Sequence, residues 1–145
     1  MTTIAGLKKR VDGLNVSDQS QFAIDDTRGQ LVLKQQMQML HGLDAKGEKI
    51  GKYRNPEYAA AKYAMNPLAG EGYVDLRLTK QFFNDQFVDV RTDVFVIDSG
   101  DPKTRLLVQK YGEDIFGLNK DYKAEYVKED LQLVFLQNVR KAVKL

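Results

Sequence analysis

Few residues in this sequence have the types and spacing that catalysis requires. The one histidine, His41, has no serine or aspartate at a spacing that indicates a triad, so nucleophilic catalysis has no support. We predict that His41 lies in the last turn of a helix, where an imidazolium would interact favourably with the helix dipole. We therefore interpret it as a structural or surface residue.

Two glycine-bearing segments resemble parts of nucleotide sites. Residues 42–49 have the glycine spacing of a phosphate-binding loop, but Glu48 stands where lysine is needed, and the segment follows a helix and not a strand. Residues 70–72 lack the third glycine of a dinucleotide fingerprint. Both segments are better interpreted as turns, and residues 98–101 likewise lack the alternating ligands of a calcium loop.

The remaining candidates for chemistry are carboxylates. Asp89 with Asp93, or Glu129 with Asp130, could act in acid–base catalysis, but solvated surface charge is a far commoner role. The chain has no cysteine, which excludes disulfides, thiolate zinc sites and a cysteine nucleophile. We therefore expect a protein that is not an enzyme and that needs no metal or cofactor.

Charge and hydropathy indicate little about partners. The formal net charge is +2, too small to predict nucleic-acid binding by itself. Basic residues do gather near both termini, where they could contact phosphates or an acidic partner, although a solvated helix face is the commoner case; they are Lys8, Lys9, Arg10, Arg140, Lys141 and Lys144. With no signal-peptide pattern and no apolar run near about 18 residues, we expect neither export nor membrane insertion.

Tyrosine is the residue type that best indicates a binding surface. Tyr53, Tyr58, Tyr63 and Tyr73 lie within one short stretch. Tyrosine is favoured at protein interfaces because its ring is apolar and its tip is polar. Packing in the core explains the cluster equally well at this stage.

The elements that would carry these residues begin with an amphipathic arm. Residues 1–24 have apolar side chains at helical spacing followed by a polar stretch, and we expect this arm to become ordered against a partner. Residues 25–145 are predicted to form a single α+β domain. Its first helix should begin at a cap on Asp25 or Asp26 and continue to about Leu43, with an apolar surface wide enough to need cover on two sides.

Local signals mark the next elements. Asn55 followed by Pro56 predicts a helix over residues 55–65, which Asn66 and Pro67 should end. Residues 86–90 and 94–97 are rich in β-branched and aromatic side chains on either side of Arg91, Thr92 and Asp93, so we predict an antiparallel hairpin.

Two further helices follow the hairpin. A helix over residues 103–111 should begin after Asp101 and Pro102 and end at Gly112. The terminal helix should begin at Asn119 or Asp121 and reach about Val143. We predict that its stripe of Val127, Leu131, Val134 and Phe135 packs on the sheet, leaving Leu133, Leu136 or Val143 for a second layer or a neighbouring copy.

Three segments occur in a characteristic order: residues 55–62 (Asn-Pro-Glu-Tyr-Ala-Ala-Ala-Lys), 74–79 (Val-Asp-Leu-Arg-Leu-Thr) and 111–118 (Tyr-Gly-Glu-Asp-Ile-Phe-Gly-Leu). This order resembles the small tail-completion, tail-terminator and neck ring proteins of tailed bacteriophages, over about residues 50–143. The composition is also similar to neck and ring proteins of crAss-like phages. The sequence departs from the pattern at Lys80, where the family has glycine, and at Glu113 and Asp114 after the Tyr-Gly step.

The resemblance implies a small antiparallel sheet flanked by helices, with a long C-terminal helix and a helical N-terminal arm. It implies a virion protein, assembled in the bacterial host cytoplasm, that forms a closed homo-oligomer of six or twelve copies at the head–tail junction. Its neighbours would be portal, connector or tail proteins, and the basic termini could contact passing genome DNA without sequence specificity. The candidate interface residues are Tyr53, Tyr58, Tyr63, Tyr73, Tyr111, Phe116, Leu118, Leu133, Leu136 and Val143. The alternative is a non-enzymatic cytoplasmic module that binds a protein or peptide through the tyrosine-rich stretch.

Overall fold

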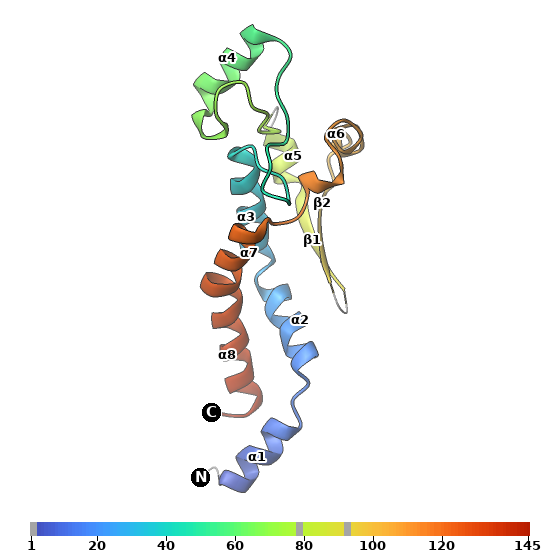
Figure 1. The fold of residues 1–145 in the computed structure, drawn as a ribbon. Helices are drawn as coiled ribbons and strands as arrows, with labels where there is room; N and C mark the ends of the chain where they lie inside the picture. Colours follow the sequence, from blue (N-terminus) through green and yellow to red (C-terminus); the bar gives the residue numbers. More distant parts are fainter. Residues whose placement is uncertain (1–2, 78–79, 92–93) are drawn as a thin grey trace.

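The computed structural model describes residues 3–77, 80–91 and 94–145. The fold is α+β, as predicted: an antiparallel hairpin, the only sheet within those ranges, lies among helices. The molecule is elongated, with helix α4 (Pro56–Met65) at one end and both termini at the other (Figure 1).

Three helices precede the first long loop: α1 (Ile4–Asp12), α2 (Val16–Asp26) and α3 (Arg28–Leu40). The predicted cap at Asp25 or Asp26 is wrong, because these residues end α2. Asn15 caps α2 instead, its side chain accepting a hydrogen bond from the Asp18 amide at 3.1 Å. Helix α2 continues across the predicted boundary between the arm, residues 1–24, and the domain, residues 25–145.

Thr27 joins α2 to α3. Its buried hydroxyl lies 2.7 Å from the carbonyl oxygen of Ala23 and 2.6 Å from the hydroxyl of Tyr126. These contacts hold the C-terminal end of α2 against the terminal helix, although Ala23 is the one buried residue of α2.

The predicted helix starts and stops around α4 are confirmed. Asn55 caps α4, accepting from the amides of Glu57 (2.9 Å) and Tyr58 (3.1 Å). Asn66 ends the helix, and the 3₁₀ turn η1 (Pro67–Ala69) follows. The short helix α5 (Lys80–Asn84), which the sequence analysis did not predict, leads into the hairpin.

The predicted hairpin is also confirmed. Strands β1 (Gln86–Val90) and β2 (Phe95–Ser99) pair antiparallel, with Val88 opposite Ile97. Both of these side chains are buried, whereas the side chains next to them along the strands are more exposed. Thr92 and Asp93, in the predicted turn, lie outside the described residues.

The C-terminal half is helical. Its elements are α6 (Thr104–Tyr111), the 3₁₀ turn η2 (Glu113–Ile115), α7 (Lys120–Tyr126), the π-helical turn η3 (Val127–Leu131) and α8 (Gln132–Ala142). Gly112 ends α6 with φ +93, a conformation that glycine adopts without strain. Asn119 begins the terminal helix by accepting from the amides of Asp121 and Tyr122. Of the two predicted starts, Asn119 is therefore correct.

The layers differ from the prediction for the terminal helix. Helices α2 and α3 pack on β1, α7 packs on α3, and α8 packs on α2 (Figure 1). The predicted packing of the stripe on the sheet is confirmed only for Leu131, which packs against the core cluster that includes Val88 and Ile97 of the hairpin. Val127 is 43% exposed, and α8 packs mainly on α2.

Candidate subunit interface

The surface of the chain is larger than a compact monomer needs. The accessible area is 9569 Å² for 16.5 kDa, whereas a compact monomer of this mass exposes about 7,500 Å². The excess of about 2,000 Å² falls within the range that a subunit of an obligate oligomer buries. Burial by a partner is one way in which such an elongated chain covers its apolar side chains.

The terminal helix contributes strongly to this surface. Helix α8 has no buried residue; Leu133 is 58% exposed and Leu136 is 44% exposed. Both were predicted to face a second layer or a neighbouring copy, and both are accessible in the isolated chain. Val134 and Phe135 are half-buried.

Two predicted interface residues do not fit that role. Val143 is 2% exposed and Leu118 is 5% exposed, so neither side chain can meet a neighbour without rearrangement. Leu118 packs with Leu31 and Ile97 in the core cluster beneath the hairpin.

The structure separates the tyrosines into two groups. Tyr53, Tyr73 and Tyr111 are half-buried, and Tyr53 and Tyr111 pack against the core cluster around Met39. Tyr58 and Tyr63, both on α4, are exposed by 38% and 42%. Core packing therefore accounts for part of the cluster, and Tyr58 and Tyr63 are the tyrosines that remain exposed.

The surface of α4 continues into other apolar side chains. Met65 is 77% exposed and Leu68 is 51% exposed, both close in sequence to Tyr63. Since α4 forms the end of the molecule opposite the termini (Figure 1), this surface and that of α8 are separated along the long axis.

A buried ion pair anchors α4. The ammonium group of Lys62 lies 2.8 Å from Asp75 Oδ1 and donates to the carbonyl oxygen of Arg77 at 2.6 Å; the Lys62 and Asp75 side chains are 8% and 2% exposed. Asn66 Nδ2 donates to Asp75 Oδ2 at 2.9 Å, and the Tyr53 hydroxyl donates to Asp75 Oδ1 at 3.3 Å. Among the described residues, the partners of this carboxylate come from α4 or from the loops beside it.

Burial opposes ionisation of Asp75, but the hydrogen bonds from Lys62, Asn66 and the Arg77 amide outweigh it and lower its pKa. Burial, together with the negative charge of Asp75, raises the pKa of Tyr53. The carboxylate is thus held charged and its neighbouring phenol neutral. This arrangement is typical of a structural ion pair that holds α4 against the neighbouring loop, and not of an acid–base pair.

Two buried glutamines hold the segment that connects η2 to α7. Gln35 Nε2 donates to Ile115 O (3.1 Å), and Gln35 Oε1 accepts from Gly117 N (2.8 Å). Gln38 Nε2 donates to Gly117 O (2.8 Å), and Gln38 Oε1 accepts from Asn119 N (2.7 Å). Both side chains are fully buried. They fix the position of Phe116, a predicted interface residue that is half-buried.

Replacing Gln38 by leucine should lower the free energy of unfolding by about 2–4 kcal/mol. The substitution leaves the buried Asn119 N and the partly buried Gly117 O without these partners; an unpaired buried group costs about 1–3 kcal/mol, and a partly buried one costs less. Urea denaturation would measure the change. The control Gln109→Leu, at an exposed position on α6, should change stability little; an equally small effect of Gln38→Leu would show that the glutamine brace is unimportant.

The other residues considered for chemistry occupy structural positions. His41 caps α3, and its Nδ1 lies 2.9 Å from Met37 O and 3.2 Å from the Tyr122 hydroxyl. Asp44 Oδ1 accepts from the amides of Lys46 and Glu48, so the glycine-spaced segment is a turn. No group of three or more potential metal ligands occurs in the described part of the chain.

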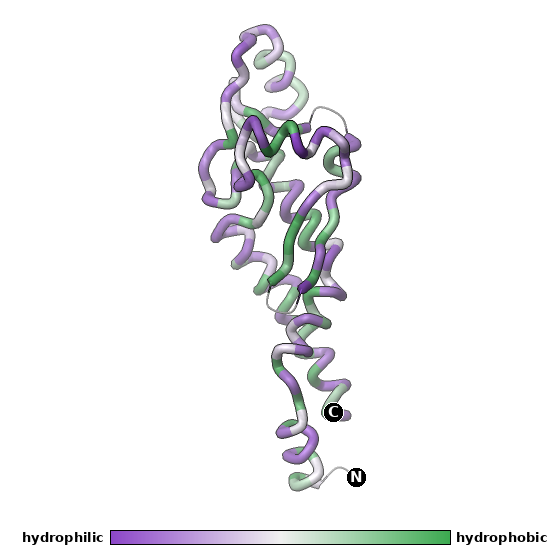
Figure 2. The backbone as a smooth tube through the Cα atoms, turned by 90° about the vertical axis from the view of Figure 1, so that its right-hand side faces the viewer, coloured by the Kyte–Doolittle hydropathy of each residue, from purple (hydrophilic) through white to green (hydrophobic). Residues whose placement is uncertain are grey.

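The two basic clusters lie at the same end of the molecule, because both views place the termini there (Figures 1 and 2). Lys8, Lys9, Arg140, Lys141 and Lys144 are exposed. Lys8 pairs with Asp12 at 2.6 Å within α1.

Sequence reasoning missed the glutamine brace and the buried ion pair. Glutamine in a helix is ordinarily a surface residue, and Lys62 follows three alanines with no sign that it is buried. The signal that could have indicated Gln35 and Gln38 is their spacing of three, which places both on one face of the helix with the apolar Leu31.

Comparison with family models, curated proteins and solved structures found no match to this chain. In the ranges that the structure describes, no helix is both long enough and apolar enough to cross a membrane.

Proposed function

We propose that this chain is a structural virion subunit that assembles with copies of itself into a ring at the head–tail junction of a tailed bacteriophage. The observation that carries the assembly is the accessible area, which exceeds that of a compact monomer by about 2,000 Å². Large apolar side chains are exposed on several elements, among them Leu133 on α8 and Met65 on α4.

The distribution of these side chains supports a ring. A cyclic oligomer uses head-to-tail contacts, so each subunit needs two different complementary surfaces. One candidate surface is Leu133 and Leu136 on α8, and another is Tyr58, Tyr63 and Met65 on α4. They lie on different elements and are chemically distinct, since one is aliphatic and the other largely aromatic.

The N-terminal helix supports contact with a further neighbour. Helix α1 has no buried residue and packs extensively on no other element of the described chain. Ile4 is 88% exposed and Val11 is 49% exposed. An amphipathic helix with uncovered apolar residues gains stability when a partner covers them.

The place in the virion rests on the sequence resemblance. A ring at the portal-to-tail junction would contact portal, connector or tail proteins, and the exposed basic residues near both termini fit an acidic neighbour or the phosphates of passing DNA.

Electron microscopy of the purified chain tests the proposal. We expect closed rings of uniform diameter, and we expect them to stack on portal complexes from the same phage. Open filaments or dispersed monomers at all concentrations would contradict it.

A further inference from the structure

The hairpin leaves one strand edge unpaired. Arg91 N donates to Val94 O (2.8 Å) at one end of the ladder, and Gly100 N donates to Asp85 O (2.9 Å) at the other. Hydrogen-bonded pairs alternate along antiparallel strands, so between these ends Phe95, Ile97 and Ser99 direct their amides and carbonyls away from β1.

Only part of this outer edge is satisfied within the chain. Ser99 N donates to Asp98 Oδ1 (2.8 Å), and Ser99 O accepts from Thr104 Oγ1 (3.2 Å). The outward amides and carbonyls of Phe95 and Ile97 have no hydrogen-bond partner among the described residues, although Ile97 is only 4% exposed. Backbone groups that are largely buried and unpaired cost free energy until something pairs with them.

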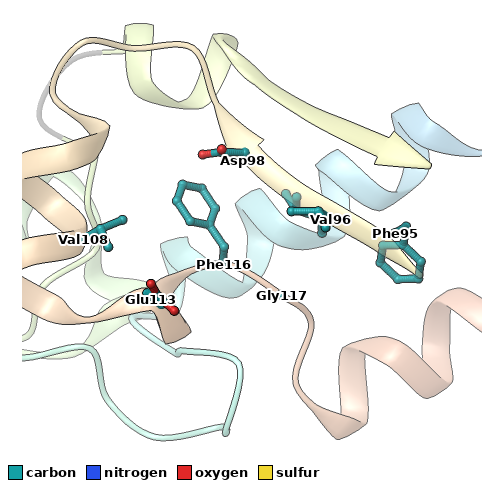
Figure 3. Close-up of a pocket in the computed structure, with 8 residues that line it drawn as sticks. Phe95, Val96, Asp98, Val108, Glu113, Phe116 and Gly117 are labelled. Carbon is teal, nitrogen blue, oxygen red and sulfur yellow. The ribbon is translucent and has the colours of Figure 1, made fainter. Parts of the chain in front are cut away.

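The edge opens into a groove. The groove has a volume of about 500 Å³ and runs between β2 and the segment that carries Phe116 and Gly117. Figure 3 shows Phe116 facing the strand, with Asp98 above its ring and Glu113 near one end. Gln35, through Gly117, holds the far wall in place.

The outer edge of β1 is partly occupied, in contrast. Arg28 Nη1 donates to Val88 O at 3.1 Å, and α3 packs on this strand. A two-stranded hairpin is marginal by itself and gains stability from a third strand. The outer edge of β2 is therefore the candidate place for a third strand.

The charges at the groove define the occupant. Asp98 and Glu113 line it and form no ion pair with any cation of the described chain. We infer that β2 binds an extended, basic segment of a partner protein as a third strand, pairing its backbone with Phe95 and Ile97 and its cationic side chains with Asp98 and Glu113. This inference rests on the groove alone and holds even if the chain does not form rings.

Peptide binding to the full-length chain tests it. The probe is an acetylated and amidated peptide, Lys-Val-Thr-Val-Lys, with two versions N-methylated at alternate residues in opposite phase. Alternate amides of an added strand point to opposite edges, and only one edge donates to β2. The peptide that is N-methylated on that edge should therefore bind at least about tenfold more weakly, and the peptide methylated on the other edge should bind as well as the unmethylated peptide. Amide exchange at Phe95 and Ile97 should slow on binding. Equal binding by both phases, or no protection of these amides, would overturn the inference.

Charge reversal at the groove tests whether the peptide is bound through its lysine side chains or nonspecifically. Glu113→Lys should weaken binding of the lysine peptide and strengthen binding of a peptide with glutamate at both ends, while Glu57→Lys on α4 should change neither. Failure of Glu113→Lys to alter the preference would rule out the proposed charge recognition. If the amides of Phe95 and Ile97 were protected from exchange in an oligomer without peptide, and lost this protection on dissociation, a second copy of the chain would be the occupant. That result would overturn the inference that a different protein binds β2.

Discussion

Replacing Lys62 by methionine is expected to lower the free energy of unfolding by about 3–5 kcal/mol. Methionine fills a similar volume, but the Asp75 carboxylate, 2% exposed, then loses its cation while remaining buried. Removing one partner of a buried ion pair is costly because the other charge stays uncompensated. Urea denaturation of the two proteins would measure the difference.

The double variant Lys62→Met with Asp75→Leu provides the matched control. Replacing both charges by apolar groups removes the uncompensated charge, so most of the lost stability should return. If the double variant is as unstable as Lys62→Met, the loss reflects packing around Lys62 and not the unpaired carboxylate.

The same pair predicts how stability depends on pH. The folded-state pKa of Asp75 is lowered, so its contribution is complete above the ordinary carboxyl pKa of about 3.9 and is lost as pH falls through the lower folded value. Asp75→Asn should reduce this loss in acid denaturation. An unchanged acid transition in Asp75→Asn would show that other carboxylates control it.

Leu136→Asp is expected to abolish the oligomer while leaving the fold of the subunit intact. Leu136 is 44% exposed, so a charge there stays solvated in the free chain but would be buried at an interface. Sedimentation would measure assembly, and thermal unfolding would measure the fold. The unfolding midpoint of the variant should match that of the dissociated wild-type subunit.

Val143→Asp is the contrasting control, because Val143, the residue directly after α8, is 2% exposed. A charge in that position should destabilise the subunit by several kcal/mol. Unfolding of Leu136→Asp while Leu136→Ala still assembles normally would place Leu136 in the core and contradict its role at an interface.

Elements with strong local signals were predictable from the sequence. Asn55 with Pro56, Asn119 and Gly112 act within a few residues of themselves, and each begins or ends a helix as expected. The hairpin was predictable for the same reason, since its two strands lie on either side of a short connection.

Features that depend on distant contacts were not predictable. Helix α2 is polar and was interpreted as part of an arm, but the contacts of Thr27 with Tyr126 hold its end inside the fold. The packing of α8 depends on which helices pack on the hairpin. Sequence periodicity indicates that a helix has an apolar face but not which element that face contacts. The π-helical turn η3 also has no local signal that we recognised.

The candidate interface was predictable only in part. The wide apolar circumference of the terminal helix indicated that residues would remain uncovered, and Leu133 and Leu136 are exposed accordingly. The helical periodicity did not indicate that Leu136 is exposed and Val143 is buried, because the burial of each side chain depends on which other elements pack beside it. The open edge of β2 follows from strand pairing and not from the residue types along it.

Native mass spectrometry of the purified full-length chain tests the proposed assembly most directly. We expect one dominant closed species of six or twelve copies, stable over a range of concentrations, and we expect Leu136→Asp to convert it to monomer. A wild-type chain that is monomeric at every concentration would contradict the ring, as would a ladder of oligomers of all sizes.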